Sequence, residues 1–146
     1  MQKYSNMKKI IFSIFITMVV LVGCSKGGDT PSPTPTPTPT PEATIAYGID
    51  IDPGSGNIYA ALGASQTINI TLSSTVPSAG VTIDVKTTKD ADGATISSSS
   101  VAATTAKNTL SIDNLQSGVL CTTTITIASK SSASNTLTKS FKIARK

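Results

Sequence analysis

The chain has 146 residues, enough for one domain with appendages, and it contains neither histidine nor tryptophan. The absence of histidine excludes Ser–His and Cys–His catalysis and any metal site that depends on imidazole. Twelve basic and eight acidic residues give a formal charge of +4, but three of the lysines lie within the first nine residues. Without that leader the net charge falls to +1, so nothing in the charge balance points to a nucleic-acid partner.

The first 23 residues have the organisation of a secretory signal peptide. Lys3, Lys8 and Lys9 precede an apolar stretch that runs from Ile10 to Val22. Thirteen residues are too few for a helix to cross the hydrocarbon core of a bilayer, which takes about 20. A short membrane anchor or a buried helix is the alternative interpretation. We expect residues 1–23 to be a signal peptide that is removed from the mature protein.

The apolar stretch ends in the sequence Leu21-Val22-Gly23-Cys24. This tetrapeptide resembles the lipobox of bacterial lipoproteins, where aliphatic and small residues precede a cysteine. The resemblance implies cleavage between Gly23 and Cys24, a diacylglyceryl group on the Cys24 thiol, and an acyl chain such as palmitate on the new amino terminus. Two or three chains anchor a protein stably, because each buried methylene contributes about 0.8 kcal/mol. The resemblance also implies a bacterial cell envelope location, and Ser25 in place of the aspartate of inner-membrane lipoproteins favours the outer membrane.

Proline occupies every second position of the sequence TPSPTPTPTPTP, which runs from Thr30 to Pro41. Proline fixes φ, removes an amide donor and restricts the preceding residue to extended conformations. We therefore expect residues 24–41 to be a disordered linker whose proline-rich part favours polyproline II and spans on the order of 37 Å. Our interpretation is a stalk that lifts a domain off the lipid surface. A ligand for a proline-recognition domain and an O-glycosylated stalk are alternatives.

Residues 42–146 show the period of two that is typical of β-strands, with many β-branched residues and turn sequences between the runs. Apolar side chains such as Ile68, Ile70 and Leu72 alternate with polar ones, which predicts antiparallel sheets packed face to face. We expect about seven strands, and a further edge strand within Asn57–Leu62. The seven lie within Thr44–Ile51, Gln66–Ser73, Val81–Thr87, Ala94–Ser100, Asn108–Leu115, Cys121–Ala128 and Leu137–Ala144.

About seven short strands in roughly 100 residues is the size and pattern of an immunoglobulin-like sandwich, with a small β-barrel as the alternative. The sequence LSIDNLQSGVLCTTTITIAS resembles the stretch around the penultimate strands of fibronectin type III domains. Leu115, Gly118 and Cys121 occupy the Leu, Gly and Tyr positions of the motif L-x-P-G-x-x-Y, and Ser117 replaces its proline. The resemblance implies that residues 42–146 form one Ig-like or fibronectin III-like antiparallel sandwich, in which the corner hydrogen bond of the missing tyrosine is absent or replaced.

A second stretch also resembles known surface modules. The sequence LSSTVPSAGVTIDV, from Leu72 to Val85, is similar to the corner between early strands of Ig-like and Calx-beta-like domains in bacterial surface proteins. Both resemblances concern the fold, and sandwiches of this kind carry many unrelated functions.

Cys121 is the only thiol left if Cys24 is lipidated. Alternation places it on the same face as Ile125 and Ile127, so we interpret it as a buried, inert residue of the core. A catalytic cysteine would need a base, and the chain has no histidine to supply one.

Two acidic clusters contain the oxygen ligands that calcium prefers. Asp50, Asp52 and Asn57 lie in the sequence DIDPGSGN, and Asp90 and Asp92 lie in KDADG. Neither cluster has the spacing of an EF-hand loop, and tight turns use Asp and Gly for backbone reasons alone. We therefore interpret both clusters as turns and expect no metal cofactor, with calcium as the weaker alternative. Paired carboxylates for glycoside cleavage could be drawn from the same residues, but no acidic pair shows a sign of burial.

Tyr59 is the one aromatic ring that we expect to be exposed, and it is the candidate for a ligand contact. Tyr47 and Phe141 share the apolar parity of their strands, so we expect both in the core. A single exposed ring makes a poor platform for a sugar.

These observations predict a non-enzymatic envelope lipoprotein that serves as an adhesion module or as an accessory subunit of a surface assembly. Its expected partners are membrane lipid through Cys24 and another envelope protein or a surface polymer, without nucleic acid. A surface glycan-binding lipoprotein and a small calcium-dependent enzyme or sensor are the alternatives.

Overall fold

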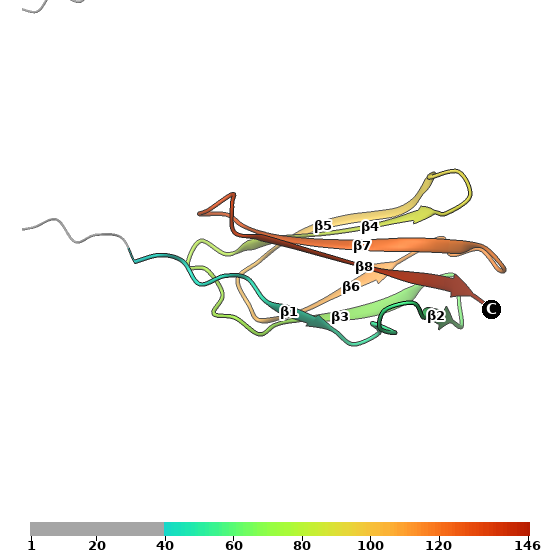
Figure 1. Ribbon diagram of the computed structural model, residues 1–146, viewed down its shortest axis with the longest axis horizontal. Coiled ribbons are helices and arrows are strands. Elements are labelled where there is room, and N and C mark those ends of the chain that lie inside the picture. Colours follow the sequence, from blue (N-terminus) through green and yellow to red (C-terminus); the bar gives the residue numbers. More distant parts are fainter. Residues whose placement is uncertain (1–39) are drawn as a thin grey trace, which may run out of the picture. The chain divides into compact units, whose positions relative to one another are not determined.

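The computed structural model describes residues 40–146, which contain eight β-strands and no helix (Figure 1). No membrane-crossing helix is therefore found in this part of the chain. The predictions on residues 1–39, including the signal peptide, the cleavage after Gly23 and the lipid on Cys24, lie outside the described residues. The strands are β1 (Tyr47–Ile49), β2 (Ile58–Ala61), β3 (Gln66–Leu72), β4 (Val81–Lys89), β5 (Thr95–Ala103), β6 (Lys107–Ile112), β7 (Leu120–Ser129) and β8 (Thr136–Arg145).

The strands form two sheets that pack face to face (Figure 1). One sheet has three strands in the order β1-β3-β6, and the other has five in the order β2-β8-β7-β4-β5. The all-β sandwich predicted from the alternation is confirmed. The additional edge strand is present as β2, and the serine-rich segment forms β5.

The pairing of β2 corrects the expectation of purely antiparallel sheets. β1 pairs antiparallel with β3, and the chain then crosses to the other sheet, where β2 runs parallel to β8. Ile58 lies opposite Lys142, and Ala61 lies opposite Arg145. The chain keeps its direction as it crosses from β1 to β2, and this direction is the same as that of β8. A period of two records which face a residue occupies and carries no information on the direction of its neighbour.

The core fills the space between the two sheets and is built from the alternate positions that the sequence indicates. Tyr47 and Phe141 lie within it as expected, with 4% and 6% of their surfaces exposed. Burying one large apolar side chain stabilises the folded state by about 1.5–3 kcal/mol, so the residues of this core supply most of the favourable free energy of folding. The large aliphatic side chains that are fully buried come from both sheets and the corner before β7, and they are Ile68, Ile70, Val81, Ile83, Val85, Ile112, Leu115, Ile125, Ile127 and Ile143.

Two threonines interrupt this apolar core on neighbouring strands. Thr87 of β4 and Thr123 of β7 are register partners, and both are completely buried. Their hydroxyl oxygens lie 2.8 Å apart and form a hydrogen bond. Because each hydroxyl gives the other its partner, the pair avoids the cost of a buried polar group without one.

The chain enters and leaves the sandwich at opposite ends (Figure 1). Residue 40 lies at the end that carries the β3–β4 and β7–β8 connections, and the C-terminus lies near the β4–β5 and β6–β7 connections. At the first end Gly80 adopts a φ of +80°, and a Cβ there would come within 2.6 Å of the Ala103 carbonyl oxygen. Only glycine fits this close approach between the β3–β4 connection and the end of β5.

Candidate functional site

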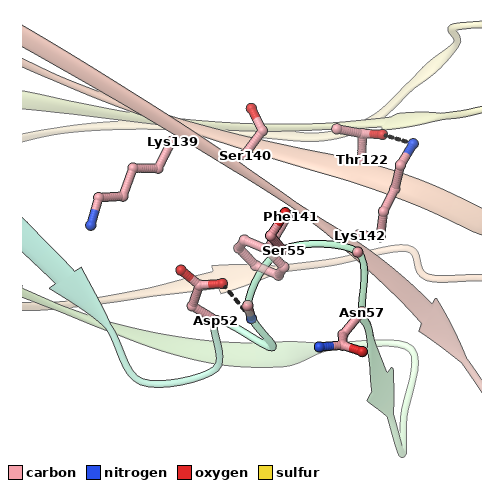
Figure 2. A pocket seen from close by; sticks show the side chains of 10 residues that line it. Asp52, Ser55, Asn57, Thr122, Lys139, Ser140, Phe141 and Lys142 are labelled. Atoms are coloured by element: carbon pink, nitrogen blue, oxygen red, sulfur yellow. Dashed lines mark hydrogen bonds between the residues drawn. The ribbon is translucent and has the colours of Figure 1, made fainter.

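A polar groove of about 450 Å³ lies between the turn that leads into β2 and the strand β8 (Figure 2). Ser55 and Asn57 face it from the turn, and Lys139, Ser140 and Lys142 face it from β8. The groove combines hydroxyl, amide and ammonium groups above the largely buried ring of Phe141. The remaining polar side chains that line it are those of Asp52 and Thr122.

The first acidic cluster does not converge on one point. Asp52 accepts a hydrogen bond from the Gly54 amide at 3.0 Å, and Asn57 donates through its amide to the Pro53 carbonyl at 3.0 Å, so both side chains hold the turn (Figure 2). Asp50 instead accepts from the backbone and side-chain amides of Asn69 at 2.9 and 2.7 Å. Turn and strand contacts therefore occupy the residues that we considered for calcium.

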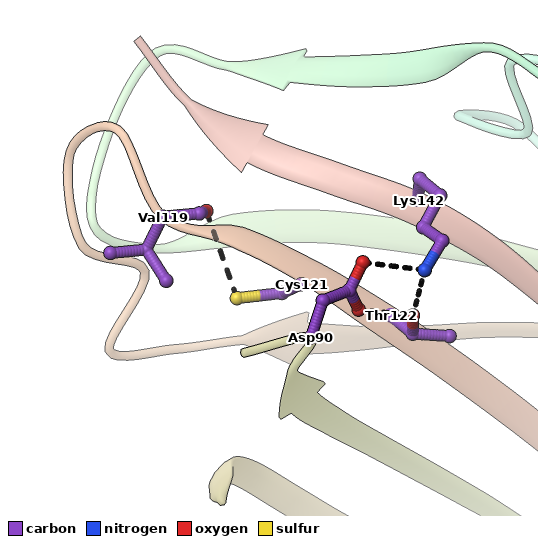
Figure 3. Close-up of polar contacts among 5 residues, drawn as sticks. All are labelled: Asp90, Val119, Cys121, Thr122 and Lys142. Carbon is purple, nitrogen blue, oxygen red and sulfur yellow. Dashed lines mark hydrogen bonds and ion pairs between the residues drawn. The ribbon is translucent and has the colours of Figure 1, made fainter. Parts of the chain in front are cut away.

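The second acidic cluster also divides between two roles. Asp92 accepts a hydrogen bond from the Ala94 amide at 2.8 Å and so closes the hairpin between β4 and β5. The Asp90 carboxylate forms an ion pair with the Lys142 ammonium and accepts a hydrogen bond from the Thr122 hydroxyl (Figure 3). Hydrogen bonds from Lys142 and then Thr122 hold the pKa of Asp90 below its ordinary value. Over the described range of the chain, no three carboxylate or thiol side chains gather as a metal site would require.

Cys121 lies in the core, as its position on the apolar face of the strand predicted (Figure 3). Its sulfur lies 3.8 Å from the Val119 carbonyl oxygen, two residues upstream. Burial, with a smaller contribution from the charge of Asp90, raises the pKa of its thiol. A nucleophilic cysteine needs a lowered pKa, so the environment of this thiol is that of a structural residue.

The corner before β7 has the geometry that its sequence suggests. Leu115 is 2% exposed, and Gly118 has a φ of +74°. Cys121, at the position where the related motif carries tyrosine, turns its sulfur back toward the backbone of the same corner. The sequence has no tyrosine at this position, and the contact that the structure shows there is the weak one between the Cys121 thiol and the Val119 carbonyl.

Tyr59 is not the exposed ring that we expected, and this is a correction. It is half-buried and packs against the core, and Ala61 on the same face of β2 is completely buried. The outward positions of β2 are those of Ile58, which is 53% exposed, and Ala60. Tyr59 lies opposite the buried Ile143 in the register of β2 on β8, so it takes the inward face of the sheet, and the sequence gives no sign of that register.

Lys139 is a residue whose role the sequence analysis missed. It occupies an inward-facing position of β8, between Leu137 and Phe141, and its ammonium donates to the Tyr47 carbonyl at 2.6 Å. The same ammonium lies 4.9 Å from the centre of the Tyr47 ring. The Tyr47 hydroxyl donates to the Ile125 carbonyl at 2.7 Å, and burial raises the pKa of Tyr47 to about 12. The sequence did contain a signal for this role, because Lys139 alternates in phase with the apolar residues Leu137 and Phe141.

Glu42 forms a second arrangement that the sequence analysis missed, at the point where the chain enters the sandwich. Its carboxylate accepts hydrogen bonds from the hydroxyls of Ser129 and Ser131 and from the Asn135 amide. Asn135 also donates to the Ala43 carbonyl at 2.9 Å. These hydrogen bonds, from Ser131 first, lower the pKa of Glu42. We call this arrangement the Glu42 clamp.

Comparison with models of protein families finds none that matches the chain, and comparison with curated proteins finds no significant similarity.

Proposed function

We propose that this protein is a bacterial envelope lipoprotein that displays a non-enzymatic, Ig-like binding module on a proline-rich stalk. The observation that carries the proposal is the Glu42 clamp, which fastens the end of the proline-rich sequence to one end of the sandwich. The opposite end, with the C-terminus, is left free of that attachment (Figure 1). Such an arrangement suits a domain that is attached at one end and exposes its opposite end to a binding partner.

The clamp gives the junction a defined direction. Asn135 donates to Glu42 and Ala43 and accepts from the Ile45 amide at 2.9 Å, so three positions of the entering chain are bonded to one side chain. A flexible linker would need no such contacts. A semi-rigid stalk transmits its direction to the domain only if the junction is fixed, and that is the role we assign to the clamp.

The lipid anchor rests on the sequence Leu21-Val22-Gly23-Cys24. Its resemblance to a lipobox, after a basic segment and a short apolar one, supports lipidation of Cys24 in a cell envelope, and Ser25 directly after it favours the outer membrane. Acylation of this one residue with two or three chains is sufficient for stable anchoring.

The Ig-like assignment is supported by the order of the strands. The first strand region is divided between the two sheets, as β1 beside β3 and β2 beside β8. The remaining strands place β3 and β6 on one sheet and β4, β7 and β8 on the other. This distribution resembles the immunoglobulin arrangement, in which strands B and E oppose C, F and G.

A binding role is further supported by how the reactive side chains are used. The Cys121 thiol has a raised pKa and a buried position, and Asp52, Asp90 and Asp92 hydrogen-bond within turns or across strands. In a sandwich of this kind, recognition falls to strand edges and polar faces.

The anchor is tested with the full-length chain in a Gram-negative host. We expect the wild-type protein in the membrane fraction, with a mass increase that corresponds to a diacylglyceryl group and an acyl chain. Cys24→Ser should abolish the mass increase and release the protein, whereas Cys121→Ser, the matched control, should retain both lipid and membrane location. Recovery of the wild-type chain as an unmodified soluble protein would contradict the proposal.

A glycan-binding role is the second candidate, and the polar groove beside β8 is the observation that favours it. Asn57 and Ser140 line it, and each retains hydrogen-bonding capacity beyond its contact with the Pro53 carbonyl or the Thr124 hydroxyl. If the groove binds saccharides, Ser140→Ala should weaken binding on a glycan array and Ser134→Ala, in the distant β7–β8 connection, should not. Equal binding by both variants would remove this candidate.

A further inference from the structure

β5 is the longest edge strand in the part of the chain that the structure describes. It spans nine residues, Thr95–Ala103, and within the domain it pairs only with β4. Its sequence, TISSSSVAA, contains no charged residue and no proline. Proteins usually protect such edges with charges, prolines or very short strands, because unpaired peptide groups recruit further strands. β5 has none of these protections.

The hydrogen-bonding pattern identifies which peptide groups of β5 are free. The Lys89 amide donates to the Ala94 carbonyl, so this residue of β4 faces β5, and alternation turns Val85 and Ile83 the same way. Their register partners, which face back toward β4, are Ser99 and Val101. The outward-facing peptide groups of β5 therefore belong to Ser98, Ser100 and Ala102.

Only the first residues of the β5 edge, as far as Ser97, are covered by other parts of the described chain. The Asn114 side chain donates to the Ile96 carbonyl at 3.0 Å, and the Asp113 amide donates to the Ser97 hydroxyl at 3.0 Å. Beyond Ser97 the described residues offer no further cover. On the inward face of this open stretch Val101 is 41% exposed, although its partner Ile83 is completely buried.

We propose that β5 pairs with β5 of a second copy of this chain, antiparallel and around a twofold axis at Ser99. Because Ser99 is the middle residue of the strand, this register centres the two strands on each other, and the freely paired stretch is Ser98–Ser100, since Asn114 covers the Ile96 carbonyl in each copy. It places Ser98 opposite Ser100 of the second copy, so that their outward peptide groups form hydrogen bonds in both directions. It also lays Ser97 of the second copy against the exposed side chain of Val101.

Charge weakly favours this register over the one with its axis at Ser100. On the outward face of β4, Asp84 lies beside Ser100 and Lys86 lies beside Ser98. With the axis at Ser99, each Asp84 shares a row with Lys86 of the second copy. With the axis at Ser100, Asp84 would share a row with Asp84. The charges are three strand spacings apart, about 14 Å, so their contribution is small and serves to choose the register.

The Ser99 hydroxyl adds a second reason. Its oxygen is buried without a hydrogen-bond partner, one of two such side-chain atoms in residues 40–146. On the proposed axis the two Ser99 residues form a non-hydrogen-bonded pair, whose Cα atoms lie about 4.5 Å apart. A rotation about χ1 brings each hydroxyl toward the other, and serine hydroxyls bond well across such pairs.

The register is tested by disulfide formation in the full-length chain, purified in mild detergent. A Cα separation of about 4.5 Å suits a disulfide, so Ser99→Cys should form a covalent dimer on mild oxidation, above the background of the unsubstituted chain. The control is Thr138→Cys on the outward face of β8, which is more exposed and should cross-link at background level. Equal yields from both variants, or no dimer from Ser99→Cys, would overturn the proposal.

The edge itself is tested by blocking it without disturbing the domain. The amide of Ser100 faces outward, so Ser100→Pro should leave the thermal unfolding temperature nearly unchanged. It removes one interchain donor from each copy, and we expect the association constant, measured by sedimentation, to fall by at least about tenfold. Val101→Lys, which places an inward-pointing charge at the edge, should have the same effect. Undiminished association in both variants would show that β5 is not the contact.

Discussion

The two edges of the five-stranded sheet meet solvent in different ways. On one side, the four-residue strand β2 covers the last residues of β8, and Lys139 carries a charge inward farther along the same strand. On the other side, β5 presents nine residues without charge or proline. Short edge strands and inward-pointing charges are the means by which proteins prevent strand addition. The comparison shows that this sandwich prevents it on one side and permits it on the other.

The side of the sheet at β8 also has stabilising side-chain contacts that the side at β5 lacks. Tyr47 reaches across the core to the Ile125 carbonyl, and Lys139 holds the Tyr47 carbonyl and the face of its ring. At β5, by contrast, Val101 is partly exposed and the Ser99 hydroxyl has no partner. The contacts that stabilise the core therefore gather near β8, and the peptide groups without partners gather at β5.

The largest effect should follow from removing Tyr47. Tyr47→Ala leaves a cavity in the core and a free Ile125 carbonyl, and should lower the free energy of unfolding by roughly 3–5 kcal/mol in urea denaturation. Val101→Ala on the open side is the matched control and should cost less than about 1 kcal/mol. Similar losses at both positions would mean that the two sides do not differ in stability.

A smaller effect is expected at Lys139. Lys139→Met keeps the aliphatic stem but removes the ammonium from the Tyr47 carbonyl and ring, and should cost about 1 kcal/mol. It also removes the inward charge, so the variant should self-associate more strongly in sedimentation experiments than the wild type. Lys86→Met, at an outward position of β4, controls for the loss of a positive charge. Unchanged association of Lys139→Met would argue against its protective role.

The smallest effect concerns the Glu42 clamp, and it depends on pH. The pKa of Glu42 is lowered from 4.5 in the folded protein, so its stabilising effect is present above about pH 4.5 and is lost as the pH falls through the folded-state value. The wild type should therefore unfold at a slightly higher temperature than Glu42→Gln near neutral pH, and the difference should shrink in acid. A difference that stays constant with pH would show that the carboxylate charge is not involved.

The sequence alone predicted the elements of the fold and most of the core. The alternation of Ile68, Ile70 and Leu72 identified a strand and its buried face, because a period of two follows directly from strand geometry. It could not reveal the parallel pairing of β2, since the neighbour of an edge strand depends on contacts far away in the chain. The inward position of Tyr59 follows from its register with Ile143 of β8 and was mispredicted, because that register depends on the same distant contacts.

The candidate sites were less accessible to sequence reasoning. Asp52 and Asp92 do hold turns, because an aspartate followed within two residues by glycine or a turn amide forms these contacts locally. Glu42 depends on partners such as Asn135 that lie more than ninety positions later. Lys139 was not singled out from the sequence, although its phase with Leu137 and Phe141 places it inward. Contacts within a turn could be predicted from the sequence, and contacts between residues far apart in the chain could not.

The difference between the two edges is tested most directly by amide hydrogen exchange of the full-length protein over a range of concentrations. We expect the Ser98 and Ser100 amides to exchange fast in dilute solution and to become protected as the concentration rises, while the Ser99 amide, which is bonded to β4, stays protected throughout. Rapid exchange of Ser98 and Ser100 at every concentration would contradict this expectation.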